Sequence, residues 1–157
     1  MSALYTVAIR DLPERRVIGL PHIGPYPEVG PVFRRVWSIL GEAGLQDLAA
    51  DGVMLAWSDP DTVPAAELRS FAGVLWPEDA PRPTALEEER LAPGRHAVLT
   101  HVGPYETLKP AYDWLFGTWM NDAAEMPGRG PSYEIYRNDP SDTPAESLRT
   151  DICVPLA

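Results

Sequence analysis

The stretch His22-Ile23-Gly24-Pro25-Tyr26 recurs 79 residues later as His101-Val102-Gly103-Pro104-Tyr105. The same offset pairs Arg16 with Arg95, Leu20 with Leu99, Pro31 with Pro110, Phe33 with Tyr112, Val36 with Leu115, Trp37 with Phe116 and Trp57 with Tyr136, and an offset of 80 pairs residues 68–70 with residues 148–150. A match that continues through four successive segments is typical of an internal duplication. The sequence therefore predicts two copies of one structural unit.

Each copy is expected to form a strand, a helix and two further strands. Residues 16–20 and 96–100 are apolar and partly β-branched, as strands are, and the Gly-Pro-Tyr that follows each of them turns the chain. Apolar side chains then recur at helical spacing over residues 32–40 and 108–119. The remaining strands are predicted near residues 53–58, 68–75, 133–137 and 148–154.

These elements predict an α+β fold. It is a duplicated strand–helix–strand–strand unit with pseudo-twofold symmetry, in which an antiparallel sheet carries two helices on one face. We expect one domain over residues 1–157, with repeat one at 5–76, a stiff proline-rich linker at 77–86 and repeat two at 87–156. The acidic run Glu87-Glu88-Glu89 is expected to be a solvated stretch before a strand.

The composition favours a cytoplasmic protein of one domain. With 157 residues, 45% of them hydrophobic, the chain is long enough to build one core. It has no run of about 18 apolar residues that would span a membrane, and its start shows no basic stretch followed by an apolar one, as a secretory signal would. Its single cysteine, Cys153, excludes an internal disulfide.

The net charge and the pattern of histidines argue against two kinds of partner, nucleic acid and metal ions. The formal net charge of −10 and the scattered 13 Lys and Arg residues argue against direct binding to nucleic acid. His22 and His101 occupy equivalent positions in the two copies, which favours a structural role for both. Because no cluster of Cys or His residues accompanies them, we expect neither a metal nor a cofactor.

A second motif follows the second predicted helix. It reads Tyr133-Glu134-Ile135-Tyr136-Arg137-Asn138-Asp139-Pro140. Together with the duplicated His-x-Gly-Pro-Tyr, it resembles the GyrI-like (SbmC) family of small-molecule-binding proteins, which is related to the effector-binding domain of multidrug-responsive regulators such as BmrR. The resemblance extends from Tyr5 to Leu156. It implies the same duplicated fold, a groove between the two halves for aromatic or cationic molecules, and a buried glutamate that matches Glu134.

Glu134 is the first candidate for a binding residue. Strand alternation places Glu134 and Tyr136 on one face, and the repeat maps Leu55 and Trp57 onto their positions, so we expect all four side chains on a shared face. A buried carboxylate is costly unless something pairs with it, and a cationic ligand stacked on aromatic rings would be such a partner. The alternative is that this face is exposed and Glu134 is an ordinary surface acid.

Aromatic residues are numerous, and most of them are expected in the core because a helical aromatic stripe usually packs there. The predicted ligand-binding residues are Glu134, Tyr136, Trp57 and Tyr112, with Trp37 and Phe116 as further candidates. If the protein is an enzyme, Glu134 and Tyr112 are the predicted catalytic residues.

Three functions remain open at this point. The first is binding of a small organic molecule, a planar, hydrophobic and in some cases cationic drug or toxin, for sequestration or sensing. The second, implied by the resemblance, is a hydrolase that opens cyclopropanoid electrophiles, in which Glu134 assists water. The third is a protein–protein module that modulates DNA gyrase. The chain is expected to be a monomer or a homodimer without a membrane partner.

Overall fold

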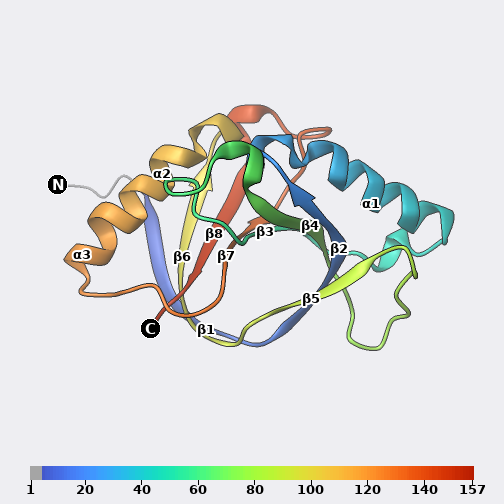
Figure 1. Cartoon of the computed structure of the whole chain (residues 1–157), viewed down its shortest axis with the longest axis horizontal. Helices are drawn as coiled ribbons and strands as arrows, with labels where there is room; N and C mark the ends of the chain where they lie inside the picture. The colour runs from blue at the N-terminus through green and yellow to red at the C-terminus, as the bar shows by residue number, and fades with distance from the viewer. Residues whose placement is uncertain (1–4) are drawn as a thin grey trace. The chain divides into compact units, whose positions relative to one another are not determined.

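A computed structural model describes residues 5–157 and shows the expected α+β fold (Figure 1). The chain divides into two compact units, which we name after a central strand of each. The β4 unit is Glu14–Ala92, and the β8 unit is Pro93–Ala157 together with the segment up to Pro13. None of the helices in residues 5–157 is both long and apolar enough to cross a membrane.

The β4 unit contains four antiparallel strands in the order β3-β4-β2-β5. They are β2 (Arg15–Ile23), β3 (Gly52–Ala56), β4 (Arg69–Leu75) and β5 (Glu87–Leu91), with the helix α1 (Gly30–Glu42) and the 3-10 turns Tyr26–Val29, Gln46–Leu48 and Ala65–Glu67. Helix α1 packs on one face of these strands, because its buried Val36 and Leu40 form a core with Ile18 and Val74.

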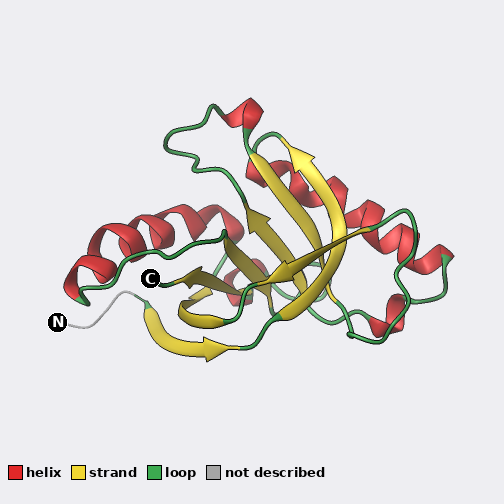
Figure 2. Ribbon diagram, turned by 60° about the horizontal axis from the view of Figure 1, so that its bottom comes forward, coloured by secondary structure: helices red, strands yellow, loops and turns green. Residues whose placement is uncertain are grey.

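The β8 unit repeats this arrangement with strands in the order β1-β6-β8-β7. They are β1 (Thr6–Leu12), β6 (Gly94–Val102), β7 (Ser132–Tyr136) and β8 (Arg149–Pro155), with α2 (Leu108–Trp114), a π-helical segment (Leu115–Trp119), α3 (Met120–Asp122) and the 3-10 turns Tyr105–Thr107 and Ala145–Ser147. Figure 2 shows these helices and strands by type. The expected internal duplication is confirmed, because β2 pairs with β4 as β6 pairs with β8.

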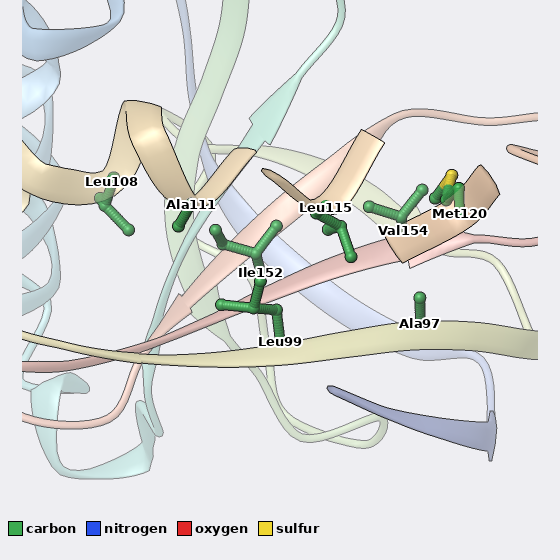
Figure 3. Close-up of a cluster of buried hydrophobic side chains, with 8 residues drawn as sticks. All are labelled: Ala97, Leu99, Leu108, Ala111, Leu115, Met120, Ile152 and Val154. Atoms are coloured by element: carbon green, nitrogen blue, oxygen red, sulfur yellow. The ribbon is translucent and has the colours of Figure 1, made fainter. Parts of the chain in front are cut away.

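The core of the β8 unit lies between its helix and its strands (Figure 3). Leu108, Ala111, Leu115 and Met120 of the helix face Ala97, Leu99, Ile152 and Val154 of β6 and β8. This packing fixes which side of the β8 unit's sheet carries the helix. Strand residues that alternate with Ile152 and Val154 therefore point to the opposite side.

Two strands were missing from the sequence prediction. β1 lies at the start of the predicted first repeat but pairs with β6, and β5 lies at the start of the predicted second repeat but pairs with β2. The compact units therefore differ from the predicted repeats at 5–76 and 87–156. Glu87 and Glu88 are exposed, as a solvated stretch would be, but the expectation that the acidic run Glu87-Glu88-Glu89 comes before a strand is wrong, because these residues are themselves part of β5, opposite Val17, Ile18 and Gly19. Their charges suit an edge strand, since exposed acidic side chains discourage further strand pairing.

The glycines of the duplicated motif have a backbone reason. Gly24 and Gly103 have φ angles of 136° and 140°, a backbone conformation that residues with a Cβ atom rarely adopt. Each donates its N–H to the residue just before the neighbouring strand of the sheet, Gly24 to the carbonyl of Leu68 before β4 and Gly103 to that of Leu148 before β8, both at 2.8 Å. The motif is thus a sharp, hydrogen-bonded exit from β2 and β6.

The offset between the two copies changes inside the helix. The N–H of Ala43 bonds to the carbonyl of Ile39, and the N–H of Ala123 bonds to that of Trp119, so the copies are 80 residues apart from the helix end onward. The strand registers agree with this offset. Met54 lies opposite Ala72, and Glu134 lies opposite Ile152. Met54, not Leu55, is therefore the counterpart of Glu134, and the predicted match of Trp57 with Tyr136 is wrong.

Candidate binding site around Glu134

Glu134 lies on β7 beneath the helix of the β8 unit. Its side chain is 6% exposed and stands opposite Ile152, on the sheet face that carries α2. The hydroxyl of Tyr112, from α2, donates to Oε2 of Glu134 at 2.6 Å. The hydroxyl of Tyr136, two residues along β7, donates to Oε1 at 2.6 Å. Each carboxylate oxygen thus accepts one phenolic hydrogen bond, which fixes the orientation of the group.

Among the described residues 5–157, the charge of this carboxylate has no cationic partner. Burial raises the pKa of Glu134 above its ordinary value, and the hydrogen bonds from Tyr112 and Tyr136 only oppose that rise. Within residues 5–157, Glu134 forms no ion pair; the nearby Arg137 bonds to Asp151 instead, at 2.8 Å. Burial and then the charge of Glu134 raise the pKa of both tyrosine hydroxyls well above the ordinary value, so they remain hydrogen-bond donors.

Further aromatic rings surround the three hydrogen-bonded residues. The rings of Tyr112 and Phe116 are parallel, with an angle of 5° between their planes and 6.5 Å between centroids. The ring of Tyr105 meets Tyr136 edge to face at 5.5 Å. Phe116 is 41% exposed, so this cluster extends from the buried carboxylate to the surface of the unit. A carboxylate bordered by aromatic rings is suited to an organic cation.

Four of the six predicted ligand-binding residues lie together in the β8 unit. They are Glu134, Tyr136, Tyr112 and Phe116. The other two, Trp37 and Trp57, belong to the β4 unit, where they are 41% and 36% exposed. Their part in ligand binding stays a prediction. His22 and His101, which the sequence analysis set aside, flank the motif glycines, and the described residues hold no group of three potential metal ligands.

The prediction that Trp57 and Leu55 share a face with Glu134 is wrong, because Trp57 and Leu55 lie on the face of their sheet without a helix and Glu134 lies on the helix-covered face of its own. Leu55 lies opposite Phe71, and the ring of Trp57 packs on Phe71 at 5.8 Å between centroids. Phe71 alternates with Ala72 and Val74, and Val74 packs under α1, so Trp57 is on the face away from its helix. Glu134, in contrast, lies on the face of the β8 unit's strands that carries the helix. The one-residue change of offset explains the error.

Tyr105 is the residue of the cluster that the sequence analysis did not select. It is the last residue of the second His-x-Gly-Pro-Tyr, and its counterpart in the first is Tyr26. The hydroxyl of Tyr26 bonds to the main chain of Ser58. Tyr105 instead packs its ring against Tyr136. The duplicated motif could have pointed to Tyr105, because a tyrosine present in both copies can be structural in one copy and contribute to the candidate site in the other.

Comparison with known proteins agrees with this fold. The chain belongs to the GyrI-like family, since the model of the GyrI-like small molecule binding domain matches residues 5–157. A DNA gyrase inhibitor of Erwinia billingiae is 28% identical over 148 residues, which is 86% of this chain and 88% of the relative.

Three solved structures share the fold. The C-terminal domain of EcmrR has a TM-score of 0.73 at 16% identity, with 99% of both chains covered. SAV2435 bound to tetraphenylphosphonium has a TM-score of 0.67 at 16% identity, covering 97% of this chain and 94% of that one. A hydrolase from Listeria innocua has a TM-score of 0.66 at 14% identity, covering 96% and 91%.

Proposed function

We propose that the β8 unit binds a small aromatic cation, with Glu134 as the countercharge and the surrounding rings as stacking surface. The biological role would be sequestration or sensing of a planar, hydrophobic drug or toxin. The observation that carries the proposal is that Glu134 is buried and accepts two tyrosine hydrogen bonds but forms no ion pair within residues 5–157.

The chemistry follows from that observation. An ionised carboxylate in a low-dielectric site is costly, and hydrogen bonds from neutral hydroxyls compensate for only part of the cost. A monovalent organic cation would supply the missing charge and also bury its apolar surface against Tyr112, Tyr136 and Phe116. Neutral molecules would gain only the apolar contacts. The site therefore favours cations over neutral molecules of the same shape.

The fold relative SAV2435 supports the choice of a probe. Its structure contains tetraphenylphosphonium, a hydrophobic monovalent cation. Tetraphenylphosphonium can be titrated into this protein by isothermal calorimetry, with triphenylphosphine oxide as a neutral aromatic control. The proposal predicts saturable binding of the cation and much weaker binding of the neutral compound. Equal affinity for both would contradict the role of Glu134 as a countercharge.

Hydrolysis is the second candidate, and a specific feature favours it. Glu134 is a carboxyl group whose pKa is raised by burial, as is common for a general base. A hydrolase from Listeria innocua has the same fold. Glu134 would accept a proton from water as the water oxygen attacks a cyclopropane carbon and the electrons of the strained bond move into the conjugated ring system. Incubation of the protein with a cyclopropanoid compound, followed by chromatography, tests this by the appearance of the ring-opened product.

The gyrase-directed alternative derives its support from the Erwinia billingiae relative, whose name is DNA gyrase inhibitor. It predicts that the protein changes DNA supercoiling by purified gyrase in the absence of any small molecule. An unchanged supercoiling rate at saturating protein would remove this alternative.

A further inference from the structure

Tyr26 and Tyr105 occupy the same place in the two copies of the His-x-Gly-Pro-Tyr motif, but the protein binds only one of their hydroxyls. Each tyrosine begins a 3-10 turn directly after the motif proline. The hydroxyl of Tyr26 donates to the carbonyl of Ser58 and accepts from the N–H of Ser58 at 3.1 Å. Among residues 5–157, the hydroxyl of Tyr105 forms no hydrogen bond, and its ring packs on Tyr136.

A strand residue next to each tyrosine accounts for this difference. Ala56 of β3 and Tyr136 of β7 are the last residues of equivalent strands and lie opposite equivalent positions of β4 and β8. The small side chain of Ala56 leaves Tyr26 room to reach the main chain after β3. Tyr136 adds a ring at this position, and Tyr105 meets that ring edge to face at 5.5 Å between centroids.

A hydrogen bond from His101 replaces the lost anchor of the turn. Nε2 of His101 lies 2.8 Å from Oγ1 of Thr107, the last residue of the turn that Tyr105 begins. The Thr107 hydroxyl donates its own hydrogen to the carbonyl of Pro104 at 2.7 Å, so it accepts the bond from His101. In the first copy, Nε2 of His22 has no hydrogen-bond partner among the described residues. The β8 unit thus fixes the turn through His101 and leaves the tyrosine hydroxyl unused.

The unused hydroxyl is a hydrogen-bond donor at the candidate site. Burial, and then the charges of Asp139 and Glu134, raise the pKa of Tyr105 above its ordinary value, so the hydroxyl stays protonated at neutral pH. The ring of Tyr105 is only partly buried, and the Tyr136 ring that it contacts carries the hydroxyl bonded to Glu134. An aromatic cation that lies along Tyr136 therefore reaches both the carboxylate and this donor.

We infer that the Tyr105 hydroxyl donates a hydrogen bond to the ligand, so that the site selects aromatic cations that carry an acceptor, such as an ether or carbonyl oxygen, apart from their charge. This inference rests on the proposed binding of cations at Glu134 and adds a polar group to the class of ligand. His101 and Thr107 are positioning residues, because they hold the turn while the tyrosine hydroxyl bonds to the ligand.

The test compares two cations with the same scaffold. They are tetraphenylphosphonium and (4-methoxyphenyl)triphenylphosphonium, which adds an ether oxygen to one ring. The variant Tyr105→Phe removes the hydroxyl and keeps the ring, and Tyr26→Phe makes the same change at the counterpart. Calorimetric titration gives the affinity of each protein for each cation. The ratio of the two affinities isolates the effect of the ether oxygen from the rest of the binding energy, and thermal melts report stability.

We expect Tyr105→Phe to lower the affinity ratio of the methoxy compound to tetraphenylphosphonium by about two- to tenfold, the scale of one neutral hydrogen bond. Tyr26→Phe should leave the ratio at its wild-type value. The melting temperatures should show the reverse. Tyr26→Phe should lower the melting temperature, because it removes the bonds to Ser58, and Tyr105→Phe should leave it unchanged.

An equal ratio in wild type and folded Tyr105→Phe overturns the inference while the binding function stands. Failure of Tyr105→Phe to fold also overturns it, because the hydroxyl would then be structural. If wild type binds neither cation, the proposed function itself fails, and the inference fails with it.

Discussion

Met54 and Glu134 occupy the same position in the two copies of one strand pair. Met54 lies opposite Ala72 in the β4 unit, and Glu134 lies opposite Ile152 in the β8 unit. Both side chains are buried. The duplicated scaffold therefore accepts an apolar side chain at this position and does not need an acid there. A buried carboxylate that the fold does not require supports the proposal of a ligand there, since costly groups concentrate at functional sites.

The first prediction concerns stability. Burial raises the pKa of Glu134 above the ordinary 4.5, so the folded protein binds this proton more tightly than the unfolded chain does. Ionisation of Glu134 at neutral pH therefore destabilises the fold, and Glu134→Gln should raise the melting temperature at about pH 7.5. The gain should shrink below about pH 4, where wild-type Glu134 is protonated in both states. Thermal melts at both pH values measure it; a lower melting temperature for the variant at neutral pH would contradict the account.

The second prediction concerns the pH dependence of binding. Protonation removes the charge of Glu134, so affinity for tetraphenylphosphonium should fall as the pH is lowered through the raised pKa, at values above 4.5. Bound cation favours the ionised carboxylate, so the midpoint should shift downward at saturating ligand. Affinity for triphenylphosphine oxide should stay constant over the same range. A cation affinity that does not vary between about pH 4 and 8 would count against Glu134.

The third prediction compares a tyrosine that donates a hydrogen bond to Glu134 with one that contacts the hydrogen-bonded residues only through its ring. The hydroxyl of Tyr112 lowers the pKa of Glu134 by donating to it. Tyr112→Phe should therefore move the midpoint of the pH profile for cation binding upward. Tyr105→Phe is the matched control, because Tyr105 contacts Tyr136 through its ring and the structure shows no hydrogen bond from its hydroxyl to Glu134. Equal midpoints in the two variants would show that the Tyr112 hydrogen bond does not tune the site.

The fourth prediction concerns Trp57. Its ring is 36% exposed and has the guanidinium of Arg69 5.9 Å from its centroid, so it can hold a cation against its face. If Trp57 belongs to the ligand site, Trp57→Ala should weaken cation binding by about 1–2 kcal/mol, the usual contribution of such stacking. Fluorescence titration measures the change. An unaltered affinity would remove Trp57 from the site.

The sequence predicted the helix faces, most strands and the pair Glu134 and Tyr136, because these depend on local periodicity and on the duplicated motif. It did not predict β1 and β5. β5 consists mostly of charged residues, so it lacks the alternation that marks a strand, and its pairing with β2 is a contact distant in the chain. The sequence also did not predict the π-helical segment Leu115–Trp119. A single inserted residue changes the offset by one, and in a strand that reverses the face of every side chain.

The central claim is that Glu134 supplies the charge that holds a cationic ligand. Its most direct test is calorimetric titration of tetraphenylphosphonium into wild type and Glu134→Gln at about pH 7.5, with product analysis on parallel samples of both proteins incubated with a cyclopropanoid compound. Glutamine keeps the shape and removes the charge, so the account predicts a loss of at least about fivefold in affinity for the cation, near 1 kcal/mol, and unchanged affinity for triphenylphosphine oxide. Retained binding with loss of a ring-opened product would instead identify the hydrolase. Unchanged affinity for the cation, with no product from either protein, would contradict the claim.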